Sequence, residues 1–210
     1  MAAPAQNYVL LDDQATGRQL YFTRPEAIIT AHSIDEIAPA FDAIETAIAR
    51  GKYIAGYFAY ELGLALEPSL QALFKTPQTL LRLGIFDAPS ETPPAEILYN
   101  RKSLDIALTP SWSEAEYSAR FDRLKSYIAQ GDCYQSNLTF ALRGHTQASA
   151  EDIFAGLRQN QPGKYGALLK LGGPDIISFS PELFFERIGN DMRMRPMKGC
   201  LLYTSPSPRD

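Results

Sequence analysis

The stretch YGALLKLGGPDIISFS, residues 165–180, joins two apolar runs through a turn at Gly172, Gly173 and Pro174. Each run is long enough for a strand, and glycine followed by proline is typical of a turn that reverses the chain. Two strands that are joined by so short a connection pair in the antiparallel direction. The stretch therefore predicts an antiparallel sheet and not the parallel sheet of a doubly wound protein.

Further apolar runs of strand length lie on both sides of this hairpin. Several are bounded by glycine or proline, as strands in antiparallel sheets commonly are. The additional predicted strands are residues 8–11, 20–22, 53–60, 81–86, 97–99, 104–108, 134–142, 183–188 and 192–197, with a hairpin loop at residues 189–191 between the last two.

Three segments between these strands have the apolar spacing of amphipathic helices. The first two begin with capping-box signals, and the third has an acidic residue in the capping position. The start signals are Ser33 with Glu36, Ser113 with Glu116, and Ser149 with Asp152, and the stop signals are Gly51, Gly131 and Pro162. The apolar stripes are Ile37, Phe41, Ile44 and Ile48; Tyr117, Phe121, Leu124 and Ile128; and Ile153, Phe154 and Leu157. The predicted fold class is α+β, with helices that cover antiparallel sheets.

The composition is that of a globular protein, with 210 residues of which 45% are hydrophobic. The net charge of -4 comes from dispersed residues, so nucleic acid is not an expected partner. Because no apolar run reaches the roughly 20 residues of a membrane helix, no membrane segment is predicted. Residues 1–6 lack the pattern of a signal peptide, which makes the cytoplasm the expected compartment.

Metal and thiol chemistry have little support in the sequence. Cys133 and Cys200 are too few for a disulfide framework or a thiolate zinc site. His32 and His145 stand apart from each other and from any ligand spacing. We therefore predict no metal site in this chain and interpret both histidines as surface or loop residues.

One lysine near the end of the sequence is a candidate nucleophile. Lys198 follows a predicted strand and lies between the apolar Met197 and Gly199, where a substrate could approach the backbone. A lysine attacks only as the neutral amine, so a pocket would have to lower its pKa from about 10.4. The alternative is a solvated lysine at a strand end.

Three motifs resemble those of one enzyme family. They are GDCYQSNLT at residues 131–139, SPELF at 180–184 and RPMKG at 195–199. In this order and spacing they are similar to the motifs of the chorismate-using family that contains aminodeoxychorismate synthase component I and anthranilate synthase component I. The segment AGYFAYE, residues 55–61, resembles the N-terminal region of the former enzyme. The resemblance extends over residues 8–199.

The resemblance implies a reaction and a role for Lys198. The amine of Lys198 would attack C2 of chorismate as the C4 hydroxyl leaves, and ammonia would then enter at C4 and displace the lysine. The product would be 4-amino-4-deoxychorismate, a precursor of p-aminobenzoate and folate. Anthranilate synthases usually have alanine at this position, so the lysine favours aminodeoxychorismate synthase.

Other groups enter through the same resemblance. Asn137 and Thr139 share one face of their predicted strand and could orient the substrate or Lys198, although half-exposed strand residues of this kind are common. Gly199 would allow close approach of the substrate. The family also implies two partners. One is a glutamine amidotransferase that supplies ammonia, and the other is a bound tryptophan. It implies Mg²⁺ in the intact enzyme as well, with glutamate ligands that are absent from this fragment.

The expected organisation is that of a truncated protein. Residues 1–109 would form the N-terminal region and residues 110–199 the start of the chorismate-binding catalytic domain. Residues 200–210 look like the translation of a sequencing adapter. We expect such a fragment to lack aminating activity. The alternatives are a fragment of anthranilate synthase component I, or a non-catalytic module that binds tryptophan or an amidotransferase.

Overall fold

The computed structural model describes residues 7–75, 78–99, 104–160 and 165–194, which fall into two compact units. The first unit contains the described residues up to 99 and those from 150 onward, and the second contains residues 104–149. The described residues form antiparallel sheets and helices joined by loops, which confirms the α+β fold class. The proposed boundary at residue 109 stays a prediction, and residues 200–210 lie outside the described residues.

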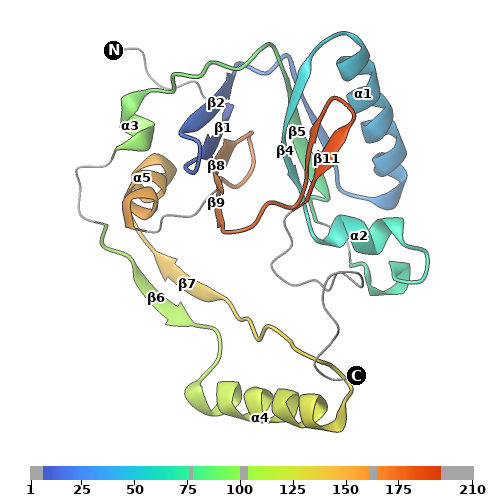
Figure 1. Ribbon diagram of the computed structural model, residues 1–210, viewed down its shortest axis with the longest axis vertical. Helices are drawn as coiled ribbons and strands as arrows, with labels where there is room; N and C mark the ends of the chain where they lie inside the picture. The colour runs from blue at the N-terminus through green and yellow to red at the C-terminus, as the bar shows by residue number, and fades with distance from the viewer. Residues whose placement is uncertain (1–6, 76–77, 100–103, 161–164, 195–210) are drawn as a thin grey trace. The chain divides into compact units, whose positions relative to one another are not determined.

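The first sheet is built from segments at opposite ends of the sequence (Figure 1). Its strands are β1 (Tyr8–Asp13), β2 (Arg18–Thr23), β8 (Tyr165–Lys170) and β9 (Ile176–Ser180), in the order β2-β1-β8-β9. All neighbours are antiparallel, and Tyr8 of β1 lies opposite Lys170 of β8. The four strands that the sequence predicted here are confirmed.

The second sheet contains β3 (Ala27–Ala31), β4 (Tyr53–Phe58) and β5 (Leu81–Phe86), in the order β3-β5-β4. The strands β4 and β5 confirm two predictions, although β4 ends before Tyr60, which is 86% exposed. Gly56 of β4 allows the two backbones to approach, because a Cβ there would overlap the carbonyl of Arg82. The strand β3 was not predicted.

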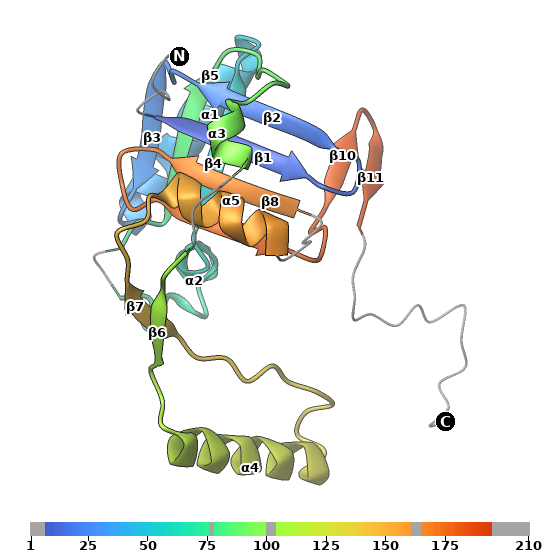
Figure 2. The ribbon, with the colours of Figure 1, turned by 90° about the vertical axis from the view of Figure 1, so that its left-hand side faces the viewer.

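Helices and sheets form four layers in the first unit, which follow one another from left to right in Figure 1, whereas Figure 2 looks onto α5 in front of the first sheet. The helices α3 (Ala95–Leu98) and α5 (Ala150–Asn160) cover one face of the first sheet. The second sheet covers its other face, and α1 (Ile37–Ala49) covers the far side of the second sheet. A short helix, α2 (Glu61–Leu66), packs near the start of α1, and a 3₁₀ turn, η2 (Gln71–Leu73), follows it.

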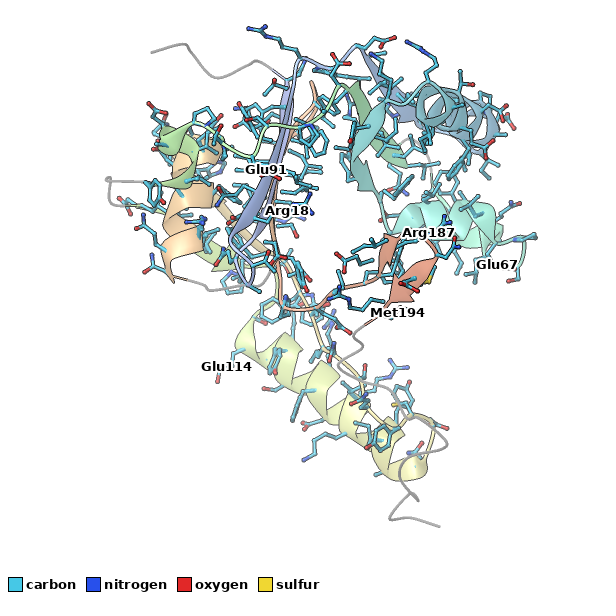
Figure 3. The ribbon with its side chains drawn as sticks, turned by 45° about the horizontal axis from the view of Figure 1, so that its top comes forward. Arg18, Glu67, Glu91, Glu114, Arg187 and Met194 are labelled. Carbon is cyan, nitrogen blue, oxygen red and sulfur yellow. The ribbon has the colours of Figure 1, made fainter. Side chains whose placement is uncertain are left out.

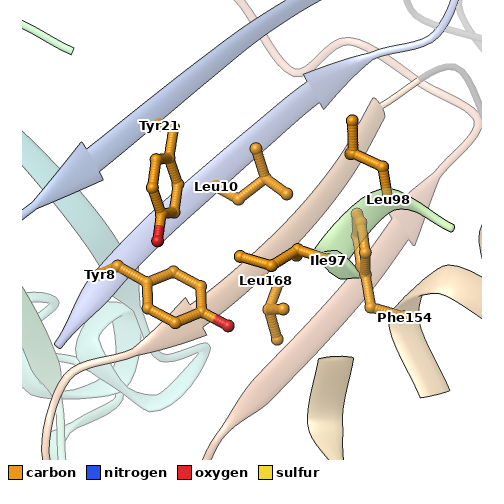
Figure 4. Packing of buried hydrophobic residues seen from close by; sticks show 7 residues of the cluster. All are labelled: Tyr8, Leu10, Tyr21, Ile97, Leu98, Phe154 and Leu168. Carbon is orange, nitrogen blue, oxygen red and sulfur yellow. The ribbon is translucent and has the colours of Figure 1, made fainter. Parts of the chain in front are cut away.

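The core under α3 and α5 explains why β1 is apolar on both faces. Tyr8 and Leu10 of β1 point to this core, whereas Val9 points to the second sheet. Because both faces are covered, the strand reads as a continuous apolar run and not as an alternating one. Figure 4 shows the cluster, which comprises Tyr8, Leu10, Tyr21, Ile97, Leu98, Phe154 and Leu168.

A predicted strand at residues 97–99 is wrong, because Ile97 and Leu98 belong to the helical turn α3. Both side chains are buried against α5 and the first sheet. A run of two or three apolar residues suits a buried helical turn as well as a strand, so the pattern alone could not decide.

The connection between β5 and α3 runs beside the outer edge of β2. The backbones of Tyr21 and Ser90 exchange two hydrogen bonds of 2.8 and 3.0 Å. Arg18 and Glu91, both labelled in Figure 3, form an exposed ion pair of 3.8 Å nearby. The edge of β2 is therefore partly covered by this loop.

The start of α1 differs from the predicted capping box. A 3₁₀ turn, η1 (Ile34–Glu36), precedes the helix, and the Ser33 side chain makes no capping hydrogen bond. The Glu36 carboxylate instead accepts a hydrogen bond from the backbone N–H of His32 at 2.6 Å. Gly51 ends the segment as predicted, with φ of +76°. Ile48, expected in the apolar stripe, is 58% exposed.

The second unit consists of α4 (Glu114–Gln130) and a two-stranded ribbon of β6 (Ala107–Pro110) and β7 (Leu142–His145). The predicted capping box of Ser113 and Glu116 is confirmed, and the helix ends at Gly131 with φ of +85°. Of the strand predicted at residues 134–142, only Leu142 lies in a strand, at the start of β7. The prediction is wrong for residues 134–141, which have no strand partner in the described chain.

A small hairpin ends the described chain. Its strands are β10 (Glu186–Ile188) and β11 (Asp191–Arg193), joined through Gly189 with φ of +61°. The predicted strand at residues 183–188 is therefore confirmed only for its last three residues, and Phe184 is 81% exposed. Of the strand predicted at 192–197, the first two residues lie in β11, and the residues after 194 lie outside the described chain.

The buried cluster in Figure 4 predicts that two phenylalanines differ in their contribution to the stability of the fold. Phe154 is fully buried, so Phe154→Ala should lower the free energy of unfolding by about 3–5 kcal/mol. The matched control, Phe184→Ala, removes an exposed ring and should change it by less than about 0.5 kcal/mol. Urea unfolding of the two variants beside the parent chain measures both values. Equal losses would contradict the packing described for α5.

Candidate functional site

Of the four predicted site residues, the structure describes Asn137 and Thr139. Lys198 and Gly199 lie outside the described residues. Asn137 and Thr139 belong to the second unit, in the exposed segment between α4 and β7. Their predicted placement on one face of a strand is wrong, because this segment forms no ladder with the described strands. Their roles toward a substrate stay predictions.

The SPELF segment at residues 180–184 begins with a turn that closes β9. The Ser180 hydroxyl accepts a hydrogen bond from the backbone N–H of Glu182 at 3.3 Å and donates one to its carbonyl at 2.9 Å. This local contact is of the kind that serine offers to turns. The serine of the motif therefore shapes the backbone where β9 ends.

A buried ion pair that the sequence did not predict lies between the first sheet and α5. Asp12 of β1 is 1% exposed. Among the described residues, it is the only buried one that carries a charge. Its carboxylate accepts hydrogen bonds from Arg158 Nε at 2.7 Å and Nη2 at 3.4 Å. Gln19 Nε2 donates a third at 3.1 Å. These donors compensate for much of the cost of burying the carboxylate, and the bond to Asp12 raises the pKa of Arg158.

A second polar cluster lies at the other end of α5. Glu151 Oε1 accepts hydrogen bonds from the Tyr8 hydroxyl at 2.7 Å and from Lys170 Nζ at 2.9 Å. Lys170 also pairs with Asp175 at 3.3 Å. Burial raises the pKa of Tyr8, and its bond to the Glu151 carboxylate raises it further.

The charges in this cluster stabilise one another. Burial alone would raise the pKa of Glu151, but the hydrogen bonds from Tyr8 and Lys170 outweigh it, and the pKa is lowered. Burial would likewise lower the pKa of Lys170, but the bond to Glu151 and the charges around it raise that pKa. Glu151 and Lys170 are therefore both held in their charged forms.

The residues of α5 that contact the first sheet follow the same order as their partners along β1. Glu151, Phe154 and Arg158 recur at intervals of three and four, so they share one face of the helix. Along β1 their contacts follow in the same order, with Tyr8 at one end and Asp12 at the other. The signal in the sequence was the alternation of Tyr8 with Asp12 on one strand face, but it does not reveal which helix lies opposite.

The polar groups of these two clusters bond to one another and hold α5 on the first sheet. Within the described ranges, no three His, Cys, Asp or Glu residues are arranged to hold a metal ion. The described residues therefore contain no carboxylate cluster that would fit Mg²⁺. His32 Nδ1 lies 3.3 Å from the Thr79 hydroxyl, and Cys133 is a half-buried free thiol. No helix in the described chain combines the length and apolarity that crossing a membrane requires.

Comparison with known proteins identifies the family. A family model described as chorismate binding enzyme matches residues 6–205, which is nearly the whole chain. The chain belongs to the chorismate binding enzyme family.

Relatives of this chain include aminodeoxychorismate synthases and anthranilate synthases. Aminodeoxychorismate synthase component 1 of Escherichia coli is 35% identical over 103 residues, which cover 46% of this chain and 22% of the relative. Anthranilate synthase component 1 3 of Haloarcula marismortui is 33% identical over 86 residues, 41% of this chain and 17% of the relative. Anthranilate synthase component 1 of Streptomyces coelicolor is 35% identical over 92 residues, which cover 43% of this chain and 18% of the relative. The matched part of the chain thus spans about a fifth of these relatives.

The buried ion pair predicts a strong effect of losing one partner. In Arg158→Met, Asp12 keeps within the described chain only its bond to Gln19, so the free energy of unfolding should fall by about 3–5 kcal/mol. The double variant with Asp12→Leu removes the buried charge as well and should recover most of that loss. Urea unfolding of the three proteins measures this. A single variant that loses under about 1 kcal/mol would contradict the assignment.

The Glu151 cluster predicts a dependence of stability on pH. The pKa of Glu151 is lower in the folded chain than its ordinary value of 4.5, so its ionised form stabilises the fold above that value. This contribution is lost as pH falls through the folded pKa. The parent should therefore exceed Glu151→Gln in urea midpoint at pH 7, and the difference should shrink toward pH 3. Glu45→Gln, at an exposed position of α1, is the control. A difference that stays constant with pH would refute the prediction.

Proposed function

We propose that this chain is part of an aminodeoxychorismate synthase component I, which converts chorismate to 4-amino-4-deoxychorismate. The observation that carries the proposal is the lysine at position 198 within RPMKG, where the resemblance gives alanine in most anthranilate synthases. Membership in the chorismate binding enzyme family supports it, as does similarity to the Escherichia coli enzyme of that name.

The proposed chemistry uses Lys198 as a transient nucleophile. Its neutral amine forms a bond from Nζ to C2 of chorismate while the C4–O bond breaks and the hydroxyl leaves, taking up a proton to become water. Ammonia then forms the new bond at C4, and the electrons of the C2–Nζ bond are released to free the lysine. Asn137, Thr139 and Gly199 are proposed to orient the substrate or the lysine.

The proposed partners follow from the same reaction. Ammonia comes from a glutamine amidotransferase subunit, because component I requires a nitrogen donor. Mg²⁺ belongs to the proposal only as a charge that neutralises the carboxylates of chorismate, held by glutamates outside these 210 residues. Tryptophan binding is a further part of the proposal. We expect the 210-residue chain by itself to lack aminating activity.

A second candidate is a component I of anthranilate synthase. Similarity to anthranilate synthase component 1 from Haloarcula marismortui and Streptomyces coelicolor, at 33% and 35% identity, favours it. The two candidates differ in product, since anthranilate is aromatic and fluorescent whereas aminodeoxychorismate retains the ring of chorismate. Lys198 argues against the second candidate.

The proposal predicts that Lys198→Ala, made in the complete enzyme read from the source gene, lowers formation of aminodeoxychorismate at least about 100-fold. The assay supplies chorismate, Mg²⁺ and ammonium salt, so that no amidotransferase is needed. Lys125→Ala removes an exposed lysine of α4 and serves as the control with unchanged turnover. Mass spectrometry of the products distinguishes aminodeoxychorismate from anthranilate.

Each result bears on one part of the proposal. Anthranilate as the product would replace the first candidate with the second. Aminodeoxychorismate formed at the parent rate by Lys198→Ala would keep the reaction and remove the lysine from it. Turnover of chorismate by the 210-residue chain would refute the expected inactivity of the fragment.

A further inference from the structure

The strand β3 has an open edge. It lies at the end of the order β3-β5-β4, and its outer side meets no other strand of the described chain. Alternate residues of an edge strand direct backbone N–H and C=O groups outward, which makes the edge able to accept another strand. The edge of β2, by contrast, is partly covered through Ser90. The sequence of β3, AIITA, is rich in β-branched residues and has no charge or proline to block pairing.

A hollow of about 540 Å³ lies beside this edge, between β3, η1 and the first turns of α1. Its apolar side is formed by residues such as Ile29, Pro39 and Ala40, and its polar side includes the carboxylates of Asp35 and Glu36. Such a combination suits an arginine, because the alkyl stem packs on apolar atoms and the guanidinium bonds to carboxylates.

The charges at the two ends of β3 are complementary. The end of β3 that begins at Ala27 is surrounded by charges from several elements. There the cations Arg24, Arg50 and Lys52 exceed the anions Glu26 and Asp87 by one. After the strand, Asp35 and Glu36 add two negative charges. In the described chain neither of these two carboxylates has an ion pair, and neither does Arg24.

Arg24 has a second unusual property. Its backbone φ is +53°. In the described part of the chain, Arg24 is the only residue other than glycine with a positive φ. Glycine adopts this left-handed region at lower cost, so the backbone at Arg24 is strained. The exposed Arg24 lies just before β3 and is free to reach outward.

We propose that β3 pairs in the antiparallel direction with β3 of a second copy of this chain, and that Arg24 of each copy enters the hollow of the other. An antiparallel pair places the start of one strand beside the end of the other, so the cationic end of each copy meets the acidic end of its partner. The twofold arrangement forms this contact twice. It does not depend on the chemistry assigned to Lys198.

A charge exchange tests the pairing in the 210-residue chain. Sedimentation equilibrium should show a dimer that weakens with added salt. Arg24→Glu and Asp35→Arg each place like charges at both contacts, so each should raise the dimer dissociation constant at least about tenfold. An equal mixture of the two variants restores opposite charges at both contacts and should dimerise like the parent. Lys125→Glu, which makes the same charge change in α4, should have no effect.

Amide hydrogen exchange on the parent chain provides a measurement that no variant can disturb. The amides of β3 should become more protected as the protein concentration rises, while those of α4 should not. A chain that stays monomeric at every concentration overturns the proposal. So does a dimer that ignores Arg24→Glu, or a mixture of the two variants that fails to associate.

Discussion

The pairing of β1 with β8 is the constraint on which the first unit depends. It joins segments near the two ends of the sequence, with Tyr8 opposite Lys170 and Asp12 opposite Gly166. The register of this pairing decides which side chains of the first sheet face α5 and which face the second sheet. A shift by one residue would bury Leu11 in place of Asp12 and break both polar clusters of α5.

The helix α5 is fixed on this sheet by polar contacts at both ends and an aromatic side chain between them. Glu151 and Arg158 anchor the ends, and Phe154 fills the centre. Buried polar pairs of this kind contribute modestly to net stability, because desolvation opposes their attraction. Their consequence is geometric, since a helix that slid along the sheet would leave Asp12 without its cation. The turn at Ser180 and the hairpin that follows begin from this fixed frame.

Much of this fold follows from local patterns, and the rest depends on contacts that the sequence does not show. The hairpin at residues 165–180 and the capped helix α4 were predicted because glycine, proline and serine mark their ends. The strand β3 was missed because AIITA is a five-residue apolar run with no turn motif that defines its register. The capping box expected at Ser33 is absent, because the Glu36 N–H bonds to the Ser33 carbonyl in a 3₁₀ turn and the Glu36 carboxylate bonds to His32. Of the predicted site, only Asn137 and Thr139 are described, and the strand assigned to them lacks a partner in the described chain.

The pairing of β1 with β8 also sets an order of events during synthesis. The hairpin of β1 and β2 leaves the ribosome about 140 residues before β8, a delay of roughly 7–30 s at elongation rates of about 5–20 residues per second. A two-stranded hairpin is at best marginally stable alone, and the side chains of Val9 and Leu10 have no covering layer until the second sheet and α5 arrive. In the nascent chain, the hairpin face that carries Tyr8 and Leu10 therefore lacks its full cover until α5 and β8 have been synthesised, long after the second sheet that covers Val9.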